Sequence, residues 1–173
     1  MNVNVRLINI DDLKLLQQIA CETFLETFAS DNNKDDINQY LTEKFSPEAL
    51  GYELNNPESE FYFAEINNDV VGYLKLNFGH AQTEVQSDQS VEIERIYVSG
   101  QHQGKKIGQL LFQTAIDVAK QEQAHYIWLG VWENNAKAIG FYKKNGFVEF
   151  DKHFFILGND KQTDIMMKLQ LQA

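Results

Sequence analysis

The amino-acid sequence predicts an α/β fold in which a single mixed, mostly antiparallel sheet carries helices on both faces. The strand-like run VEIERIYV leads through the polar turn QGKKIG, residues 103–108, into an amphipathic helical pattern, and the strand-like run YIWLGV follows. Such a strand–helix–strand unit calls for two neighbouring parallel strands with a right-handed crossover. Upstream, two runs of alternating apolar residues flank a turn, which indicates an antiparallel hairpin.

The first third of the chain predicts one short strand followed by helices. Val3, Val5 and Leu7 alternate with polar residues in VNVRLINI, as in a strand. Asp11 or Asp12 can then cap a helix. The apolar residues of that helix recur at helical spacing and are Leu13, Leu16, Ala20, Phe24 and Phe28. A second helical pattern carries Ile37, Tyr40, Leu41 and Phe45, and a third begins with Ser46 as N-cap and Pro47 at its first position.

The remainder alternates strands with helices. The hairpin over FYFAEI and VVGYLKLNF turns at Asn67-Asn68-Asp69, where Asn and Asp tolerate positive φ. Residues 80–90 are polar and indicate a loop. YIWLGV is apolar enough for burial on both faces, and the helix after it ends at Asn145-Gly146, a pair suited to a left-handed C-cap. Strand-like runs near 147–150 and 163–169 close the chain.

Length and composition bound the function. At 173 residues the chain is expected to form one domain, residues 1–173. Its net charge of −10 argues against nucleic-acid binding, which needs Lys and Arg to neutralise phosphates. Residues 1–60 hold twelve acids and four bases, a pattern that could attract a cation or could simply be solvated helix faces. With one cysteine, no signal peptide and no membrane-spanning run, we expect a cytoplasmic protein without membrane contacts.

The turn at 103–108 has the properties of an anion site. A strand, a glycine-containing turn and a helix N-terminus bring several backbone N–H groups to one point, and phosphate is their usual ligand. Lys105 and Lys106 add positive charge there. The turn matches neither the Walker A pattern nor the GxGxxG dinucleotide turn. The alternative is an ordinary helix entry with two exposed lysines.

Two sequence blocks carry a resemblance to a known family. VEIERIYV-SGQHQGKKIGQLLF and WLGVWENNAKAIGFYKKNGF resemble the GCN5-related N-acetyltransferase (GNAT) family, which uses acetyl-CoA. The family's Q/R-x-x-G-x-G/A loop aligns with Gln103–Gly108, where Lys106 replaces the first family glycine. The pattern N-x-x-A-x-x-F-Y-x-x-x-G-F matches from Asn135 to Phe147. ETFLETF, EIERIYV, IWLGVWENN and QTDIMMK further resemble the PaiA-type polyamine acetyltransferases.

The resemblance implies the GNAT fold, with the central β-α-β unit as the acetyl-CoA-binding unit and no metal. It places the pyrophosphate on the amides of the 103–108 turn, and the pantetheine arm along the strand that ends at Val98, where that strand diverges from the one ending at Val131. The residues expected to bind the cofactor are Ile96, Tyr97, Val98, Gln103, Gly104, Lys105, Lys106, Ile107, Gly108, Gln109, Asn135, Ala138 and Tyr142. Tyr142 also occupies the family position of the general acid, and its alternative is a packing role beside Phe141 and Phe147.

The acceptor amine must lose a proton before it can attack, and a carboxylate can accept that proton. Glu94 is the first candidate because its strand lines the slot, and Glu92 shares its face by the two-residue period. Either could instead be a structural acid paired with Arg95 or Lys75. The four histidines show no metal-ligand spacing.

Three functions follow from the resemblance. The first is acetylation of a small amine, most simply spermidine or spermine, by direct attack on acetyl-CoA in a ternary complex. Acidic residues in the helical acceptor region would attract such a polycation, and they are Glu22, Glu26, Asp31, Asp35 and Asp36. The second is acetylation of a protein N-terminus or lysine, and the third is a non-catalytic CoA-binding regulator. A homodimer is left open.

Overall fold

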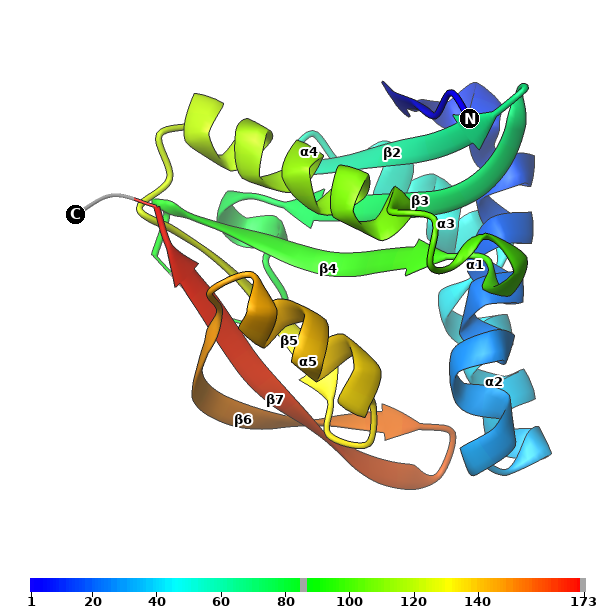
Figure 1. Ribbon diagram of the computed structural model, residues 1–173. Helices are drawn as coiled ribbons and strands as arrows, with labels where there is room; N and C mark the ends of the chain where they lie inside the picture. Colours follow the sequence, from blue (N-terminus) through cyan, green and yellow to red (C-terminus); the bar gives the residue numbers. More distant parts are fainter. Residues whose placement is uncertain (85–86, 172–173) are drawn as a thin grey trace.

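The computed structural model describes residues 1–84 and 87–171, and its centre is one mixed sheet (Figure 1). The strand order is β1-β2-β3-β4-β5-β7-β6. The strands are β1 (Asn4–Leu7), β2 (Ser59–Ile66), β3 (Asp69–Asn77), β4 (Ser90–Val98), β5 (Tyr126–Trp132), β6 (Val148–Leu157) and β7 (Asp160–Gln170). Among the strands of the described residues, only β4 and β5 pair in parallel, and the other neighbours pair antiparallel. The predicted α/β class with a mostly antiparallel sheet is confirmed.

Helices cover both faces of this sheet, and each face has its own hydrophobic cluster. The helices are α1 (Leu13–Phe28), α2 (Lys34–Lys44), α3 (Pro47–Leu54), α4 (Ile107–Gln121) and α5 (Ala136–Lys144). One cluster joins α4 and α5 to the sheet through residues such as Leu111 and Phe112. The other joins α1, α2 and α3 to the opposite face through residues such as Leu16 and Phe63. Figure 1 shows α4 and α5 together on one side, away from α1 and α3.

Several local signals act as the sequence predicts. Asn67 and Asn68 both adopt positive φ in the two-residue turn between β2 and β3, which suits the twist of a hairpin. Ser46 caps α3 by accepting a hydrogen bond from the Ala49 N–H, with Pro47 at the first helical position. Gly146 follows α5 with φ of +93°.

Two local predictions differ from the structure. Asp12 occupies the N-cap position of α1 but makes no side-chain cap bond to α1, because its carboxylate binds the Arg6 guanidinium at 2.9 and 3.1 Å and accepts from the Asn9 N–H at 3.1 Å. The final hairpin is longer than expected, with β6 and β7 nearly continuous from Val148 to Gln170. The segment between the two predicted runs is mostly exposed or half-exposed, so it lacks the apolar density that marks a buried strand.

Within the described part of the chain, none of the helices is long and apolar enough to cross a membrane.

Candidate active site

The two parallel strands at the centre of the sheet separate along their length. β4 and β5 form ladder pairs only from Ser90 with Tyr126 to Ile93 with Leu129. The β3–β4 ladder is irregular at the same level, since Lys75 pairs with Arg95 while Leu76 pairs with Ile93. Glu94 is therefore the extra residue of a β-bulge, which bends its strand and increases the twist. The separation leaves one backbone edge of β4 beyond Glu94 unpaired with β5.

Ile96, Tyr97 and Val98 lie on this part of β4. They pair with Leu74, Tyr73 and Gly72 of β3 along one edge, so their other edge faces the gap toward β5. Ile96 and Val98 contact the α4–α5 hydrophobic cluster, whereas Tyr97 contacts the α1–α3 cluster. An extended chain could add to this edge as a further strand, which is the pairing predicted for a pantetheine arm.

The turn before α4 presents free donors and positive charge. Gly104 and Lys106 have φ of +78° and +65°, so Lys106 itself adopts the left-handed conformation usually held by glycine. Lys106 is the N-cap of α4, and its side chain makes no capping bond to the described residues. The N–H groups of the first turn, including Ile107, Gly108 and Gln109, therefore remain available for an anion.

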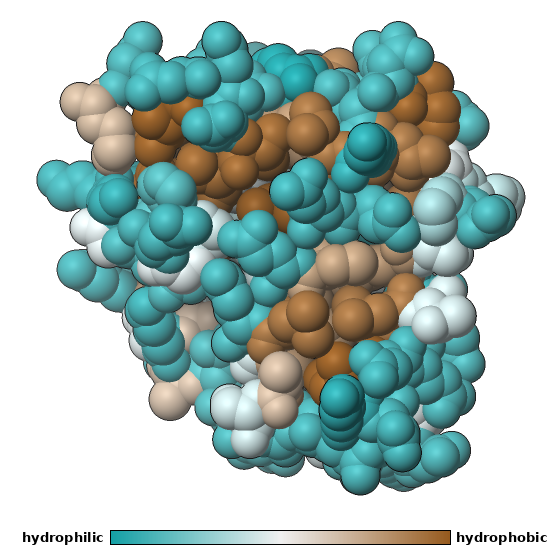
Figure 2. All heavy atoms as spheres, turned by 90° about the vertical axis from the view of Figure 1, so that its right-hand side faces the viewer, coloured by the Kyte–Doolittle hydropathy of each residue, from teal (hydrophilic) through white to brown (hydrophobic). Residues whose placement is uncertain are grey.

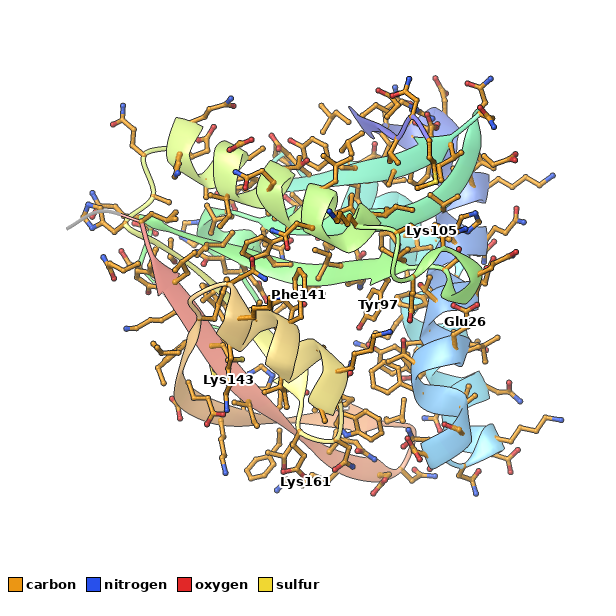
Figure 3. The ribbon with its side chains drawn as sticks, viewed as in Figure 1. Glu26, Tyr97, Lys105, Phe141, Lys143 and Lys161 are labelled. Carbon is orange, nitrogen blue, oxygen red and sulfur yellow. The ribbon has the colours of Figure 1, made fainter. Side chains whose placement is uncertain are left out.

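Neighbouring elements hold this turn in place. Glu26 of α1 accepts a hydrogen bond from the Gly100 N–H at 2.8 Å. The Gln103 amide donates to the Val98 carbonyl at 3.2 Å and accepts from the Lys137 ammonium at 2.7 Å. Figure 3 shows Glu26 and Lys105 beside the loop that joins β4 to α4, with Tyr97 at the end of β4 close by. Lys137, which the sequence did not single out, thus joins Lys105 and Lys106 near the turn.

The start and the middle of α5 border the same gap. The Asn135 side chain caps α5 by accepting from the Ala138 N–H at 3.2 Å. Tyr142 is 7 % exposed and makes aromatic contacts with Phe141 and Phe147. Burial raises the pKa of the Tyr142 phenol, and the nearby Tyr97 phenol adds to the rise. A phenol with a raised pKa keeps its proton at neutral pH, so it can donate one.

The two carboxylates predicted as bases are held by other side chains. The Glu94 carboxylate pairs with the Lys75 ammonium and, at 3.5 Å, with the Arg95 guanidinium, and it accepts from Asn77 at 2.8 Å. Burial acts to raise its pKa, but the charges of Arg95 and Lys75 and these hydrogen bonds lower it to about 2. A carboxylate this acidic is a poor proton acceptor, so the surroundings of Glu94 favour the structural alternative.

Glu92 is 3 % exposed and accepts hydrogen bonds from the Thr83 N–H and hydroxyl and from Asn77. Burial and the charge of Glu94 raise the pKa of Glu92, against those hydrogen bonds. Its oxygens are occupied and shielded from solvent, which also favours a structural role.

A cleft of about 450 Å³ lies on the α1–α3 face of the sheet, next to these carboxylates. Its lining residues are Tyr40, Glu43, Lys44, Glu53, Glu94, Arg95, Phe155 and Ile156. Arg95 and Glu53 form two hydrogen bonds of 2.7 and 3.0 Å across it. The cleft thus combines three carboxylates and two cations with an aromatic and an aliphatic wall.

The acids expected to face an acceptor do not line this cleft. Two of these acids instead make hydrogen bonds that hold other segments in place. Glu26 binds the Gly100 N–H, and Asp36 accepts from the Asn159 N–H at 3.0 Å, which joins α2 to the β6–β7 turn. Figure 2 looks onto the end of the molecule formed by α1 and α2, whose surface is largely hydrophilic around two hydrophobic patches.

The structure adds residues that no sequence signal identified. Gly130 is the first residue of β5 beyond its ladder with β4. The side chains of His153 on β6 and Asp164 on β7 lie over it. They are hydrogen-bonded to each other, with 3.0 Å between His153 Nε2 and Asp164 Oδ2. The spacing of these three residues in the sequence has no pattern, because register across the β6–β7 hairpin brings them together. Among the residues described, no group of three or more His, Cys, Asp or Glu could hold a metal ion.

Comparison with known proteins agrees with this geometry. The model of the acetyltransferase (GNAT) family matches residues 15–147. An uncharacterized N-acetyltransferase of Lactobacillus delbrueckii subsp. lactis is 37 % identical over 96 % of this chain and 98 % of its own length. The spermidine N(1)-acetyltransferase of Thermoplasma acidophilum is 27 % identical over 85 % of this chain and 89 % of its own.

Among solved structures, the PaiA N-acetyltransferase of Thermoplasma acidophilum in complex with coenzyme A superposes with a TM-score of 0.81 at 25 % identity, covering 99 % of this chain and 100 % of that one. The family match spans most of the chain, and the separated strands and the open α4 N-terminus are compatible with the binding of such a cofactor. The chain therefore belongs to the GNAT family of acetyl-CoA-dependent N-acetyltransferases.

Proposed function

We propose that this acetyltransferase transfers the acetyl group of acetyl-CoA to a primary amine of a small polyamine such as spermidine or spermine, by direct attack in a ternary complex. The observation that carries the choice of acceptor is the cleft beside Glu94, in which Glu43, Glu53 and Glu94 outnumber Lys44 and Arg95. Glu53 and Glu94 are bound by Arg95 and Lys75, so Glu43 is the lining carboxylate that no cation pairs with within the described chain. The relative that acts on spermidine supports the same class.

The residues of the slot fit the cofactor. Free N–H groups at the start of α4, with Lys105 and Lys106, would hold the pyrophosphate. The open edge of Ile96, Tyr97 and Val98 would pair with the pantetheine arm, and Asn135 and Ala138 would border it. Acetyl-CoA supplies the activated acyl carbon. Tyr142 would protonate the departing sulfur from its buried phenol.

A peptide acceptor is the alternative class, because Phe155 and Ile156 line the cleft beside its charges. Both classes are tested by measuring CoA release with acetyl-CoA and a panel of spermidine, spermine, butylamine and a short peptide with a free N-terminus. Higher kcat/KM for the polyamines is expected. Preference for the peptide would replace the polyamine assignment, and no release with any amine would contradict transfer to small amines and peptides alike.

Cytoplasmic location remains a prediction, and whether the chain forms a homodimer stays open. Size-exclusion chromatography coupled to light scattering tests the second.

A further inference from the structure

A histidine–aspartate pair lies on the cleft side of the sheet. His153 and Asp164 face each other in the β6–β7 ladder, and His153 Nε2 lies 3.0 Å from Asp164 Oδ2. Their side chains are 20 % and 18 % exposed. A carboxylate bonded to one ring nitrogen fixes the orientation of an imidazole and the nitrogen that carries its proton.

Gly130 provides the space for this pair. A Cβ at Gly130 would lie 3.2 Å from both His153 Cε1 and Asp164 Oδ2, so any larger residue there would crowd the imidazole. Because the β4–β5 ladder ends at Leu129, the pair sits at the level where the two strands begin to separate. That is also the level of the Glu94 bulge on β4.

The pair belongs to the surroundings of the cleft. His153 and Phe155 share a face of β6 by the two-residue period, and Phe155 lines the cleft. The charge of Asp164 contributes, after burial, to the raised pKa values of the phenols of Tyr40 and Tyr97. Tyr40 lines the cleft and Tyr97 lies on the open end of β4, so the aspartate is close to both.

The second ring nitrogen has an ion-pair partner but no hydrogen bond among the described residues. His153 Nδ1 is buried and lies 2.9 Å from Glu84 Oε1, with which it forms an ion pair when the ring is protonated. The hydrogen bond that His153 Nε2 donates to Asp164 raises the pKa of His153 above its ordinary 6.5, against burial, and the charges of Asp164, Glu84 and Glu92 act in the same direction. A raised pKa makes the imidazole a stronger proton acceptor.

We propose that His153, oriented by Asp164, accepts the proton that the acceptor amine must lose, directly or through one water, at Nδ1. This inference rests on the proposed function. The bound ammonium gives one proton to His153, and the neutral nitrogen forms a bond to the thioester carbonyl carbon. The carbon–sulfur bond breaks with its electron pair going to sulfur. Tyr142 gives its phenol proton to that sulfur, and the nitrogen loses its second proton to the resulting Tyr142 phenolate. His153 then releases its proton to solvent, leaving an amide, a thiol and one free proton.

The test is the pH dependence of kcat/KM with the best amine of the panel, for wild type and for three variants. In wild type, kcat/KM should rise with pH through the pKa of His153, because only the neutral imidazole accepts a proton. Asp164→Asn and Glu84→Gln should move this rise to lower pH, since each removes a negative charge from the ring. In His153→Gln the rise should vanish, and activity should increase only toward about pH 10, where an alkylamine ionises by itself.

At neutral pH, His153→Gln should lower kcat/KM by roughly 10²- to 10⁴-fold. His153→Ala should recover part of its activity when imidazole is added, which loss of a merely structural side chain would not allow. His125→Gln is the matched control, because His125 is exposed and lies at the far end of β5. Melting curves with and without acetyl-CoA report folding and cofactor binding for each variant.

The outcomes separate the two proposals. An active wild type whose pH profile is the same in Glu84→Gln, Asp164→Asn and His153→Gln overturns the role of His153 alone. Wild type inactive with every amine overturns the proposed function and this inference with it. Glu84→Gln keeps the test informative if the more buried variants do not fold, because Glu84 is 41 % exposed.

Discussion

At the scale of single residues, Lys106 shows how this chain departs from its family without losing the turn. The family's glycine position here holds a lysine with φ of +65° and ψ of 13°. A left-handed conformation costs a non-glycine residue about 1–2 kcal/mol. The strain is local, and the lysine adds its charge at the α4 N-terminus, where phosphate is expected to bind.

Lys106→Gly should therefore stabilise the fold and weaken the binding of acetyl-CoA. Relief of about 1 kcal/mol corresponds to a Tm increase of about 2–4 °C for a chain of this size. Acetyl-CoA affinity should fall, and more so at low salt, because one phosphate-facing charge is lost. Lys105→Gly is the control: it removes the same charge, but Lys105 is not among the residues with positive φ, so no stabilisation is expected. A Tm that falls in Lys106→Gly would contradict the strain argument.

Tyr142→Phe should keep the fold and acetyl-CoA binding, because the ring contacts with Phe141 and Phe147 remain. Only the hydroxyl is lost, so kcat should fall by roughly 10²- to 10⁴-fold if the phenol protonates the departing sulfur. Steady-state kinetics together with isothermal titration of acetyl-CoA measure both effects. An unchanged kcat would leave Tyr142 as a packing residue.

Glu94 should make the free energy of unfolding of this protein depend on pH in the acidic range. Its pKa is about 2 in the folded protein against an ordinary value of 4.5, so the folded state binds this proton less readily than the unfolded state. The resulting stabilisation is present above pH 4.5 and is lost as pH falls toward 2. In Glu94→Gln, the free energy of unfolding, measured with urea between pH 2 and 6, should be lower at pH 6 and should vary less with pH. An equally steep dependence in the variant would mean that other carboxylates set it.

At the scale of elements, the sequence predicts those whose signal is local. Positive φ at Asn67 and Asn68, the Ser46 cap and the β4–α4–β5 order all follow from residues close together in the chain. The β6–β7 hairpin is underestimated because its middle is half-exposed. The side-chain pairs of the candidate active site are harder still to predict. Arg95 and Glu53, for example, are 42 positions apart in the sequence and meet only when α3 packs against β4. For Glu94 the sequence offers Arg95 and Lys75 as possible partners, but only the folded packing decides that both cations bind it.

The element that should respond most to cofactor is the turn between β4 and α4. Bound acetyl-CoA would fill the open N–H groups of α4 and join α5, Lys137 and the turn through one ligand. Ligand at 100 times its Kd stabilises a protein by about 2.7 kcal/mol. Differential scanning fluorimetry should therefore show a clear rise in Tm with acetyl-CoA and a smaller rise with pantetheine, which lacks the pyrophosphate. No rise with saturating acetyl-CoA would contradict the placement of the cofactor.

At the scale of the whole molecule, the charge is divided between structural and functional uses. Residues 1–60 carry a net charge of −8, yet Glu26 and Asp36 tie the helices to the β4–α4 loop and to the β6–β7 turn. These ties connect helices α1 and α2 to both halves of the sheet. Attraction of a polycation then depends on the acids that line the cleft and on the long-range field of the remaining charge.

If that field selects the acceptor, kcat/KM for spermidine should decrease with salt more steeply than kcat/KM for butylamine, because exposed charges are screened over about 8 Å at physiological ionic strength. Glu43→Gln should raise KM for spermidine more than for butylamine, since Glu43 lines the cleft without a cation partner in the described chain. Glu48→Gln is the matched control, an exposed acid of α3 outside the lining. Both variants lose one negative charge, so any difference between them comes from position and not from net charge. Equal salt dependence for the two amines, with Glu43→Gln matching Glu48→Gln, would mean that the shape of the cleft selects the acceptor.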